Sequence, residues 1–415
     1  MVKADLAKKQ IELTYSLAEL PSSQHRAGLA GLVMVVEYLN SMKDTGVSLN
    51  VSKNGVTIKL DQDGLGAILD EIYAATEELQ GRATAFKDVT PVKTEEETYE
   101  DAKGKAKKRK IYYYPIVVPK GSFLHEFDTS ENGTWIKLWR DMVWQILRGV
   151  PATRSPYEER ARGEEPSDTT VIWKQLQQDK HRSVDLPSTY FLGAQAFNAE
   201  RVPFKDNSHF QFLLHFWPLI CQIYVPQVVD RENKKTQDGY VVAFPDIANL
   251  RDFIFAFKKA MTDRKNEVLG FRPKECLIEI PEEAGVDFLL RIAKSIGSDK
   301  LQRDADDAIF GVDIYHMKKE GNNIRILFSG RIEPDAERDR RYDELKGKLF
   351  DNHFRRQRLV NLLVRNCDWY TGFDKLMAVL PPKEVIFTRY FAHDALTSLT
   401  AADEDNKRRL KRMQK

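Results

Sequence analysis

A strand that leads directly into a long apolar helix is the feature of this chain that most constrains its fold. Residues 10–20, QIELTYSLAEL, are predicted to form a strand that runs into a loop. Pro21 and the serine after it open a helix that continues through LVMVVEYL. Gly28, Ala30 and Gly31 occupy its first turns. Small residues at these positions predict that a second backbone packs very close to the helix.

Two hairpins and several helices are predicted from the rest of the chain. Residues 47–60, VSLNVSKNGVTIKL, place alternating apolar residues around Asn54-Gly55, the preferred sequence of a type I′ hairpin turn. The second hairpin is expected across residues 307–332. The other expectations are helices at residues 64–80, 134–149 and 169–182, a Pro-punctuated loop at 150–168, and a buried strand, a turn at Pro245-Asp246 and an amphipathic helix within 238–261.

The pattern changes after residue 333, where the chain is predicted to be helical throughout. Tyr342, Leu345 and Leu349 fall at helical spacing there. The chain is therefore predicted to be an α+β protein. Residues 1–332 would form a mixed α/β region with β-hairpins, and residues 333–415 a C-terminal helical bundle. A length of 415 residues allows two or three domains.

Composition excludes several classes of protein. The 64 lysines and arginines nearly balance 62 acidic residues, so the net charge of +2 does not by itself indicate nucleic-acid binding. Cys221, Cys276 and Cys367 lie far apart without a CxxC pair, which argues against a zinc site or a disulfide framework. The N-terminus lacks an apolar signal core, and the longest apolar run, residues 212–225, is too short to span a bilayer. We expect a soluble, cytoplasmic protein with no membrane partner.

The loop before the first helix holds Ser22, Ser23, Gln24, His25 and Arg26. Ser22 or Ser23 is expected to cap the helix, which is the common role of serine at this position. Nucleophilic catalysis by a serine needs a base, an orienting acid and an oxyanion hole, and the loop lacks the GxSxG frame. A helix N-terminus beside His25 and Arg26 can also bind a phosphate through free N–H groups and the positive end of the helix dipole. These residues alone do not decide between a capping role and a phosphate contact.

His393-Asp394 form the dipeptide with which HD phosphohydrolases bind metal ions. Such enzymes need further His and Asp ligands on neighbouring helices, and His353 is the only other histidine nearby in the sequence. A chance dipeptide is the favoured interpretation. The chain has no Walker A motif, no GxGxxG and no carboxylate cluster with catalytic spacing. The sequence therefore predicts no catalytic residues, no metal site and no cofactor.

Basic residues gather in separate short segments. The acidic run TEEETYED is followed by KGKAKKRK and then by IYYYPIVVP, which indicates an exposed hairpin or loop tip between Glu95 and Lys110. A solvated loop tip is the ordinary explanation of such a run. Several basic segments in a near-neutral chain nevertheless suggest localised contacts with phosphate. The other cationic candidates are Arg154, Arg160, Arg162, Lys180, Arg182, Arg355, Arg356, Arg358 and the C-terminal run NKRRLKRMQK.

Two segments resemble a known family. LAELPSSQHRAGLAGLVMVVEYL, from Leu17 to Leu39, is similar to the start of that family, which has a strand, an LP(S/T)xQH(R/K)AGLAGL loop and an apolar helix. GYVVAFPDIANLRDF, from Gly239 to Phe253, resembles a second family segment, GYVLAIPDVxxLxxF, in the expected order. The family is the large subunit (Cas-eight type, Cmx-type, Myxan/type I-B group) of the type I CRISPR Cascade interference complex. The rest of the chain matches only loosely.

This resemblance implies RNA-guided DNA recognition without catalysis. The large subunit of Cascade contacts the 5′ end of the guide crRNA, the subunit that caps this end, and a backbone subunit. It recognises the protospacer-adjacent motif (PAM) on target double-stranded DNA, helps unwinding and R-loop formation, and positions the displaced strand. It also works beside a small subunit and recruits the helicase–nuclease effector in this antiviral defense.

Some candidate residues are expected to contact base edges in a groove of the DNA, and the others to bind its phosphates. Guide pairing supplies most of the sequence specificity, so the protein needs only a short groove-reading element. Three polar loops fit a minor-groove reader: Gln24-His25-Arg26, Lys53-Asn54 and Ser130 to Thr134. A plain type I′ turn is the simpler explanation of Lys53-Asn54. The residues expected to clamp the duplex or the displaced strand are Lys105, Lys107, Lys108, Arg109 and Lys110, and those expected to face DNA from the helical bundle are Arg355, Arg356 and Arg358.

Two other functions stay open at this point. One is an HD-type metal-dependent phosphohydrolase that uses His393 and Asp394. The other is a structural assembly subunit without DNA readout, whose basic segments meet acidic protein surfaces. A steep fall of DNA affinity with salt would argue against the structural alternative.

Overall fold

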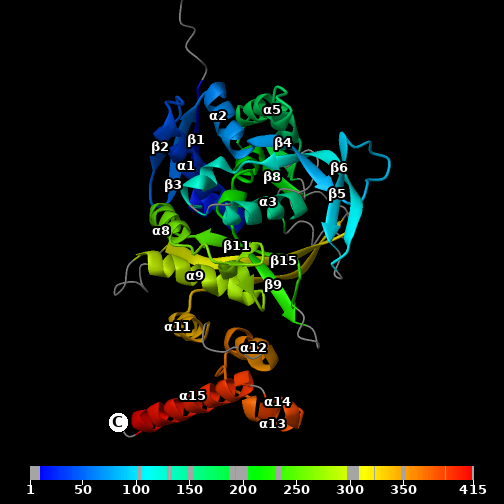
Figure 1. Cartoon of the computed structure of the whole chain (residues 1–415). Helices are drawn as coiled ribbons and strands as arrows, with labels where there is room; N and C mark the ends of the chain where they lie inside the picture. Colours follow the sequence, from blue (N-terminus) through cyan, green and yellow to red (C-terminus); the bar gives the residue numbers. More distant parts are fainter. Residues whose placement is uncertain are drawn as a thin grey trace, which may run out of the picture.

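The large sheet of this protein lies between an N-terminal group of small sheets and helices and a C-terminal group of helices (Figure 1). This arrangement confirms the predicted α+β class with a helical C-terminal part. The computed structural model describes residues 10–100, 104–128, 130, 133–146, 154–180, 182–186, 192, 204–229, 235–296, 308–321, 323–346, 352–387 and 389–413.

The first small sheet contains β1 (Ile11–Ser16), β3 (Gly55–Leu60) and β2 (Ser48–Val51) in this order, all antiparallel. The hairpin predicted at residues 47–60 is confirmed. The predicted turn type is wrong, because neither Asn54 nor Gly55 has a positive φ. Gly55 is already a strand residue opposite Ser16, and the Asn54 carbonyl accepts a bond from the Leu17 backbone N–H (2.8 Å). Pairing with the first strand therefore sets the shape of the turn.

Helix α1 (Ser23–Met42) is buried along most of its length. The predicted close approach of another backbone is confirmed at Gly28 and Gly31. A Cβ atom on these glycines would overlap the carbonyl oxygens of Leu213 and Phe216, respectively. The approaching chain is α7 (Ser208–Leu213) and the 3-10 turn after it (Trp217–Leu219).

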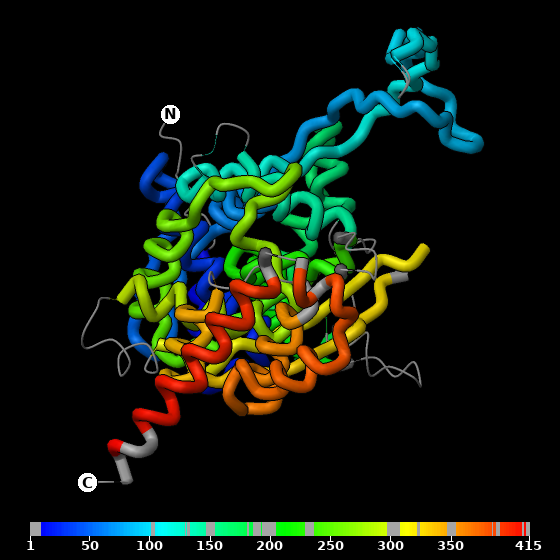
Figure 2. The backbone as a smooth tube through the Cα atoms, turned by 60° about the horizontal axis from the view of Figure 1, so that its bottom comes forward, coloured from blue at the N-terminus to red at the C-terminus, as the bar shows by residue number. Residues whose placement is uncertain are grey.

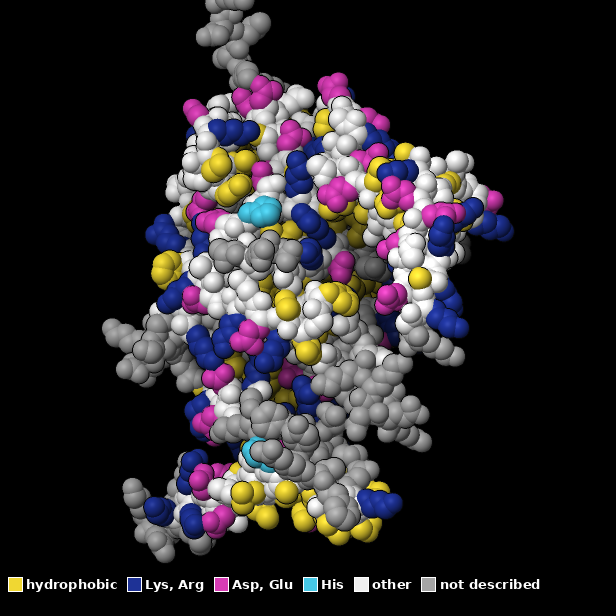
Figure 3. Space-filling model, in the orientation of Figure 1, with side chains coloured by type: hydrophobic (Ala, Val, Ile, Leu, Met, Phe, Trp, Pro, Cys, Tyr) yellow, Lys and Arg dark blue, Asp and Glu magenta, His cyan; other side chains and the backbone are white. Residues whose placement is uncertain are grey.

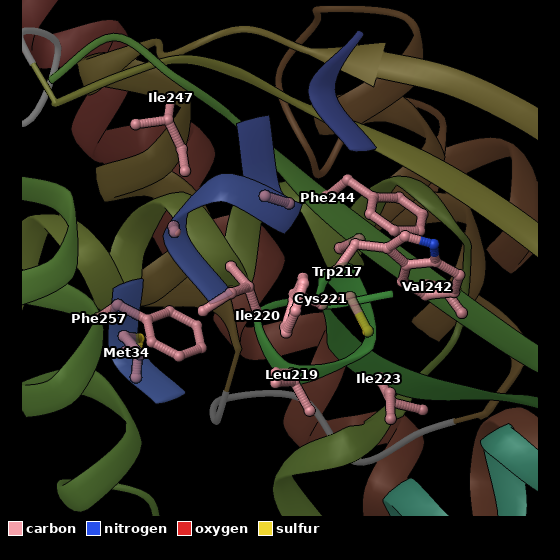
Figure 4. Close-up of a cluster of buried hydrophobic side chains, with 14 of the residues drawn as sticks. Met34, Trp217, Leu219, Ile220, Cys221, Ile223, Val242, Phe244, Ile247 and Phe257 are labelled. Carbon is pink, nitrogen blue, oxygen red and sulfur yellow. The ribbon is translucent and has the colours of Figure 1, made fainter. Parts of the chain in front are cut away.

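The large sheet has the order β10-β9-β11-β15-β16, with a further short strand beside β9. Helices α1 and α9 (Glu282–Ile296) both pack against β11. Figure 4 shows the core here, where Trp217 packs edge-to-face on Phe244. The strands are β9 (Gln222–Val229), β10 (Lys235–Gln237), β11 (Tyr240–Ile247), β14 (Leu277–Ile278), β15 (Ile309–Glu320) and β16 (Asn323–Ile332).

The predicted turn at Pro245-Asp246 is wrong, because both residues lie inside β11. Strand β9 pairs with β11 only as far as Ala243, so no strand needs an N–H from Pro245 on that side. The turn comes later, at Ala248-Asn249, and Asn249 caps the predicted helix, α8 (Leu250–Thr262).

Two further helix boundaries differ from the prediction. Helix α2 (Gln62–Ile72) ends early, and the rest of the predicted helix forms strand β4 (Ala75–Arg82). The glutamates there favour a helix weakly, but cross-strand pairing decides the outcome. The predicted loop at 150–168 contains helix α4 (Ser155–Ala161), with Pro156 in its first turn. The helices predicted near 134 and 169 are confirmed as α3 (Thr134–Ile146) and α5 (Ser167–Leu176).

The C-terminal helices attach to α9 through polar contacts. Tyr342 donates a hydrogen bond to Glu283 Oε1 (3.1 Å), Lys294 pairs with Asp343 (2.7 Å), and Lys346 pairs with the buried Asp287. Apolar packing adds to these contacts, because Leu345, Leu359 and Leu362 are buried in the main hydrophobic core. The elements are α11 (Ala336–Leu345), α12 (Asn352–Leu359), a π-helical turn (Val360–Val364), α13 (Phe373–Val379), α14 (Pro382–Phe387) and α15 (Arg389–Met413).

Asp287 gives this interface a pH dependence. Burial alone would raise the pKa of its carboxyl, but Arg291 and Lys346 lower the pKa to about 2, from an ordinary 3.8. A carboxyl with a lowered folded-state pKa stabilises the fold above its unfolded pKa, and this contribution is lost as the pH falls through the folded value. We expect D287N to lower the free energy of unfolding by about 2 kcal/mol near neutral pH. In urea unfolding, the difference from wild type should shrink between about pH 4 and pH 2, and a pH-independent difference would contradict this assignment.

Candidate nucleic-acid interface

The loop before α1 is an internal polar junction. Ser22 is the N-cap, since its Oγ accepts a bond from the His25 backbone N–H (3.4 Å), which confirms the predicted capping role. The same Oγ lies 2.7 Å from His25 Nδ1, and His25 Nε2 lies 2.9 Å from Asp206 Oδ2. Gln24 Oε1 accepts a bond from the Leu192 backbone N–H (3.2 Å). Gln24 and His25 are both buried, and their contacts join α1 to distant parts of the chain.

The hydroxyl–imidazole–carboxylate chain of Ser22, His25 and Asp206 has the connectivity of a nucleophilic triad. Sequence reasoning missed Asp206, because nothing in the pattern relates it to a loop far before it. The Ser22 hydroxyl serves here as a helix cap, and His25 is only 2% exposed. This geometry fits a structural tie between α1 and strand β8 (Phe204–Asn207).

The Arg26 side chain also has polar partners inside the fold. Its Nε donates to the Leu17 carbonyl (3.1 Å), and its Nη1 contacts the Asp246 carboxylate, which Arg331 contacts from the other side (2.7 Å). The prediction that Gln24, His25 and Arg26 hold nucleic acid does not fit these positions. Each side chain has polar partners inside the fold, and a direct contact with DNA would have to break them.

A three-stranded arm carries the densest group of exposed cations among the described residues. Strand β6 (Ala106–Pro119) pairs with β4 on one side and with β5 (Lys93–Glu100) on the other. Figure 2 shows this arm reaching out from the body of the molecule. The predicted exposed hairpin is confirmed, but most of its basic residues lie on a strand rather than in a loop. Its exposed cations include Lys105, Lys107, Lys108, Arg109 and Lys110.

Acidic residues across the strand neutralise part of this charge. Register places Glu96 opposite Lys110 and Glu97 opposite Arg109. Arg109 and Glu97 form an exposed ion pair (2.7 Å), and Lys108 lies 3.7 Å from Glu96. Figure 3 shows the two charge types side by side on the arm. Exposed ion pairs contribute little free energy, so a phosphate can compete for these cations.

Aromatic rings accompany the cations of the arm. The Arg109 guanidinium lies 5.0 Å from the Tyr99 ring, and Lys93 Nζ lies 5.7 Å from the Tyr113 ring. In the loop between β4 and β5, the Phe86 backbone N–H donates to Tyr114 Oη (3.0 Å). This hydrogen bond holds the loop against the sheet. Cations beside flat rings can contact both phosphates and bases, so the arm fits a nucleic-acid surface.

The cations predicted near residues 154–182 differ in exposure. Arg160 is mostly buried and binds both Asp70 (2.8 Å) and Asp168 (2.9 Å), so its predicted contact with nucleic acid does not fit. Arg154 is half-buried, 4.4 Å from the Trp144 ring. Arg162, Lys180 and Arg182 are exposed and stay predicted contacts.

The arginines of α12 were predicted to face DNA, and the structure separates them. Arg358 is 4% exposed, and burial, together with the nearby Arg355, lowers the pKa of its guanidinium to about 10. Arg355 pairs with Glu279 at 2.6 Å. The prediction therefore does not fit Arg355, which pairs with Glu279, or Arg358, which is buried. Arg356 alone of the three is exposed.

The other two polar loops also differ from each other. The Lys53 carbonyl accepts a bond from the Leu250 backbone N–H (2.9 Å), which fixes the hairpin tip while the side chains of Lys53 and Asn54 stay exposed. The loop from Ser130 to Thr134 serves α3, because Ser130 Oγ accepts a bond from the Thr134 backbone N–H (2.9 Å). Asn132 in this loop lies outside the described residues.

The HD pair does not resemble a metal centre. Asp394 is fully buried, His393 is half exposed, and the closest polar atoms of the two lie 3.6 Å apart. Within the described ranges, no group of three or more His, Cys, Asp or Glu residues could hold a metal ion. The described helices also include none that is long and apolar enough to cross a membrane.

Comparisons with known proteins identify the family. A sequence model of the type I-B CRISPR Cas8b N-terminal domain matches residues 47–302, and one of the Cas8b C-terminal domain matches residues 309–415. The border between these matches precedes the one predicted at residue 332, because β15 and β16 belong to the second match. No curated protein matches the chain. Cas8b proteins take part in a CRISPR Cascade complex with other Cas proteins and crRNA. The chain belongs to the Cas8b family of type I-B CRISPR large subunits.

Proposed function

We propose that this chain recognises the PAM on target double-stranded DNA and promotes R-loop formation within a type I-B Cascade. The exposed cations of the arm carry this proposal, since they extend from the body on a three-stranded sheet (Figure 2). In this role Lys105, Lys107, Lys108, Arg109 and Lys110 contact the phosphates of the duplex or of the displaced strand. The fixed hairpin tip presents Lys53 and Asn54 as groove readers.

The protein and the guide RNA have separate tasks in target recognition. Base pairing with the crRNA selects the target, and the protein supplies phosphate contacts and a short readout of the flanking duplex. The chain itself performs no chemical step in this proposal, and the helicase–nuclease that it recruits cuts the DNA. Its other partners are the backbone subunit, the subunit that caps the guide 5′ end, and the small subunit.

A salt titration distinguishes this function from purely structural assembly. Duplex binding by the guide-loaded complex is measured with and without this chain at increasing salt concentration. Each phosphate that the chain contacts should steepen the plot of log affinity against log salt by about 0.9. We expect a slope steeper by about 3 to 5 when the chain is present. Equal slopes would mean that the basic segments contact protein, and the proposal would fail.

A further inference from the structure

A cleft with a volume of about 600 Å³ separates helices α11 and α15 in the C-terminal part of the molecule (Figure 1). The lining residues on each helix follow one another at intervals of one, three or four, so they occupy a single stripe of that helix. The stripe on α11 runs from Glu337 to Leu345, and the stripe on α15 runs from Thr397 to Arg408. Two helix faces therefore look toward each other across open space.

Apolar and small side chains line part of this cleft. Leu345 is buried, Trp369 is half-buried, and Leu396 is 68% exposed. Helix α15 also presents Thr400 and Ala401, whose small side chains leave room for a neighbouring element. Apolar surface that lines a concave site favours a partner that covers it.

Carboxylates outnumber guanidinium groups in the cleft. Arg341 binds Asp368 (2.5 Å) and lies 3.8 Å from Asp405 on the opposite helix, so its charge is already offset. Arg340 pairs with two glutamates of its own helix. Five carboxylates against three guanidinium groups leave an excess of two negative charges, which repels the phosphates of nucleic acid and attracts a cationic partner. The carboxylates are those of Glu337, Glu344, Asp368, Glu404 and Asp405.

We infer that this cleft binds a basic amphipathic helix of a partner protein. The apolar face of that helix covers Trp369 and Leu396, and its lysines or arginines meet the carboxylates of the cleft. A helix fits this site better than an extended peptide, because both walls are helices and offer no strand edge for pairing. From Leu396 to Arg408 the wall of α15 is roughly 18 Å long, which matches a helix of about three turns. The cleft lies far from the arm in Figure 1, so this inference goes beyond the DNA role proposed above.

The test uses the full chain and two labelled model peptides of equal length. One peptide has leucines at helical spacing and lysines at its other positions, and the second carries glutamates in place of the lysines. In fluorescence anisotropy, the lysine peptide should bind roughly tenfold more tightly or better. E404K should weaken this binding by roughly tenfold, because the change replaces an attraction with a repulsion. A401W fills the cleft without changing its charge and should abolish binding.

Two matched controls change neighbouring residues of α15 that do not line the cleft. D403K reverses a charge at an exposed position, and L399W adds a ring where leucine is 61% exposed, so both variants should bind the lysine peptide like wild type. Equal losses in E404K and D403K, or in A401W and L399W, would overturn the inference, since binding would then not depend on the cleft. A dimer of the wild-type chain that A401W dissociates would also overturn it, in favour of a second copy as the occupant.

Discussion

Replacing Gly28 with alanine is expected to lower the free energy of unfolding by about 3 kcal/mol or more. The added Cβ atom would overlap the backbone carbonyl oxygen of Leu213, which cannot move aside as a flexible side chain can. Helix α1 packs against β11, α7 and the 3-10 turn that begins at Trp217, so displacing it disturbs the core shown in Figure 4. Urea unfolding of the purified chain measures this loss.

Gly66→Ala is the matched control for this prediction. Gly66 lies inside helix α2, and a Cβ atom there would meet only Thr169 Cγ2 at 3.6 Å, an ordinary contact. Alanine should therefore stabilise this helix by up to about 1 kcal/mol relative to glycine. Equal effects at the two glycines would contradict the close approach of α1 to the Leu213 backbone.

Neutralising the arm is expected to weaken duplex binding by the guide-loaded complex at least tenfold at physiological salt. The variant replaces Lys105, Lys107, Lys108, Arg109 and Lys110 with alanine. The salt dependence of log affinity should become less steep by about 2 to 4, because Glu96 and Glu97 already offset part of the charge. The arm projects from the body, so thermal unfolding of the variant should stay close to wild type.

The control removes the same amount of charge elsewhere. Lys43, Lys59, Lys174, Lys259 and Lys375 are exposed residues outside the arm, and their joint replacement with alanine changes the net charge equally. This control should lose little affinity and keep the wild-type salt slope. Equal losses in both variants would show that net charge, rather than the arm, governs binding.

Local patterns predicted local structure well. The alternation on both sides of Asn54-Gly55 identified a hairpin, and the small residues of α1 identified a close backbone contact. The turn type at Asn54 could not be predicted, because strand β1 and the Leu17 N–H hold it from elsewhere in the chain. Residues 75–80 could not be assigned for the same reason, since their partner strand lies more than thirty residues later.

The candidate site shows a similar limit. A basic run indicated the arm correctly because exposure there follows from the local charge. Arg160 and Arg358 were predicted from the same kind of basic segment. In the fold, the Arg160 side chain is mostly buried beside Asp168, and Arg358 is buried among the helices around α9. The polar loop from Gln24 to Arg26 was predicted to bind nucleic acid. In the fold, His25 instead contacts Asp206, and Arg26 contacts Asp246. Charge predicts a nucleic-acid contact only where no distant partner neutralises it.

The proposed function requires this chain to make target binding depend on the motif that flanks the target. Duplex affinity of the guide-loaded complex should be measured with and without the chain, on targets that differ only in this flanking motif. We expect the complex to discriminate between flanks only when the chain is present, and we expect K53A or N54A to reduce this discrimination. Binding that ignores both the chain and the flank would contradict it.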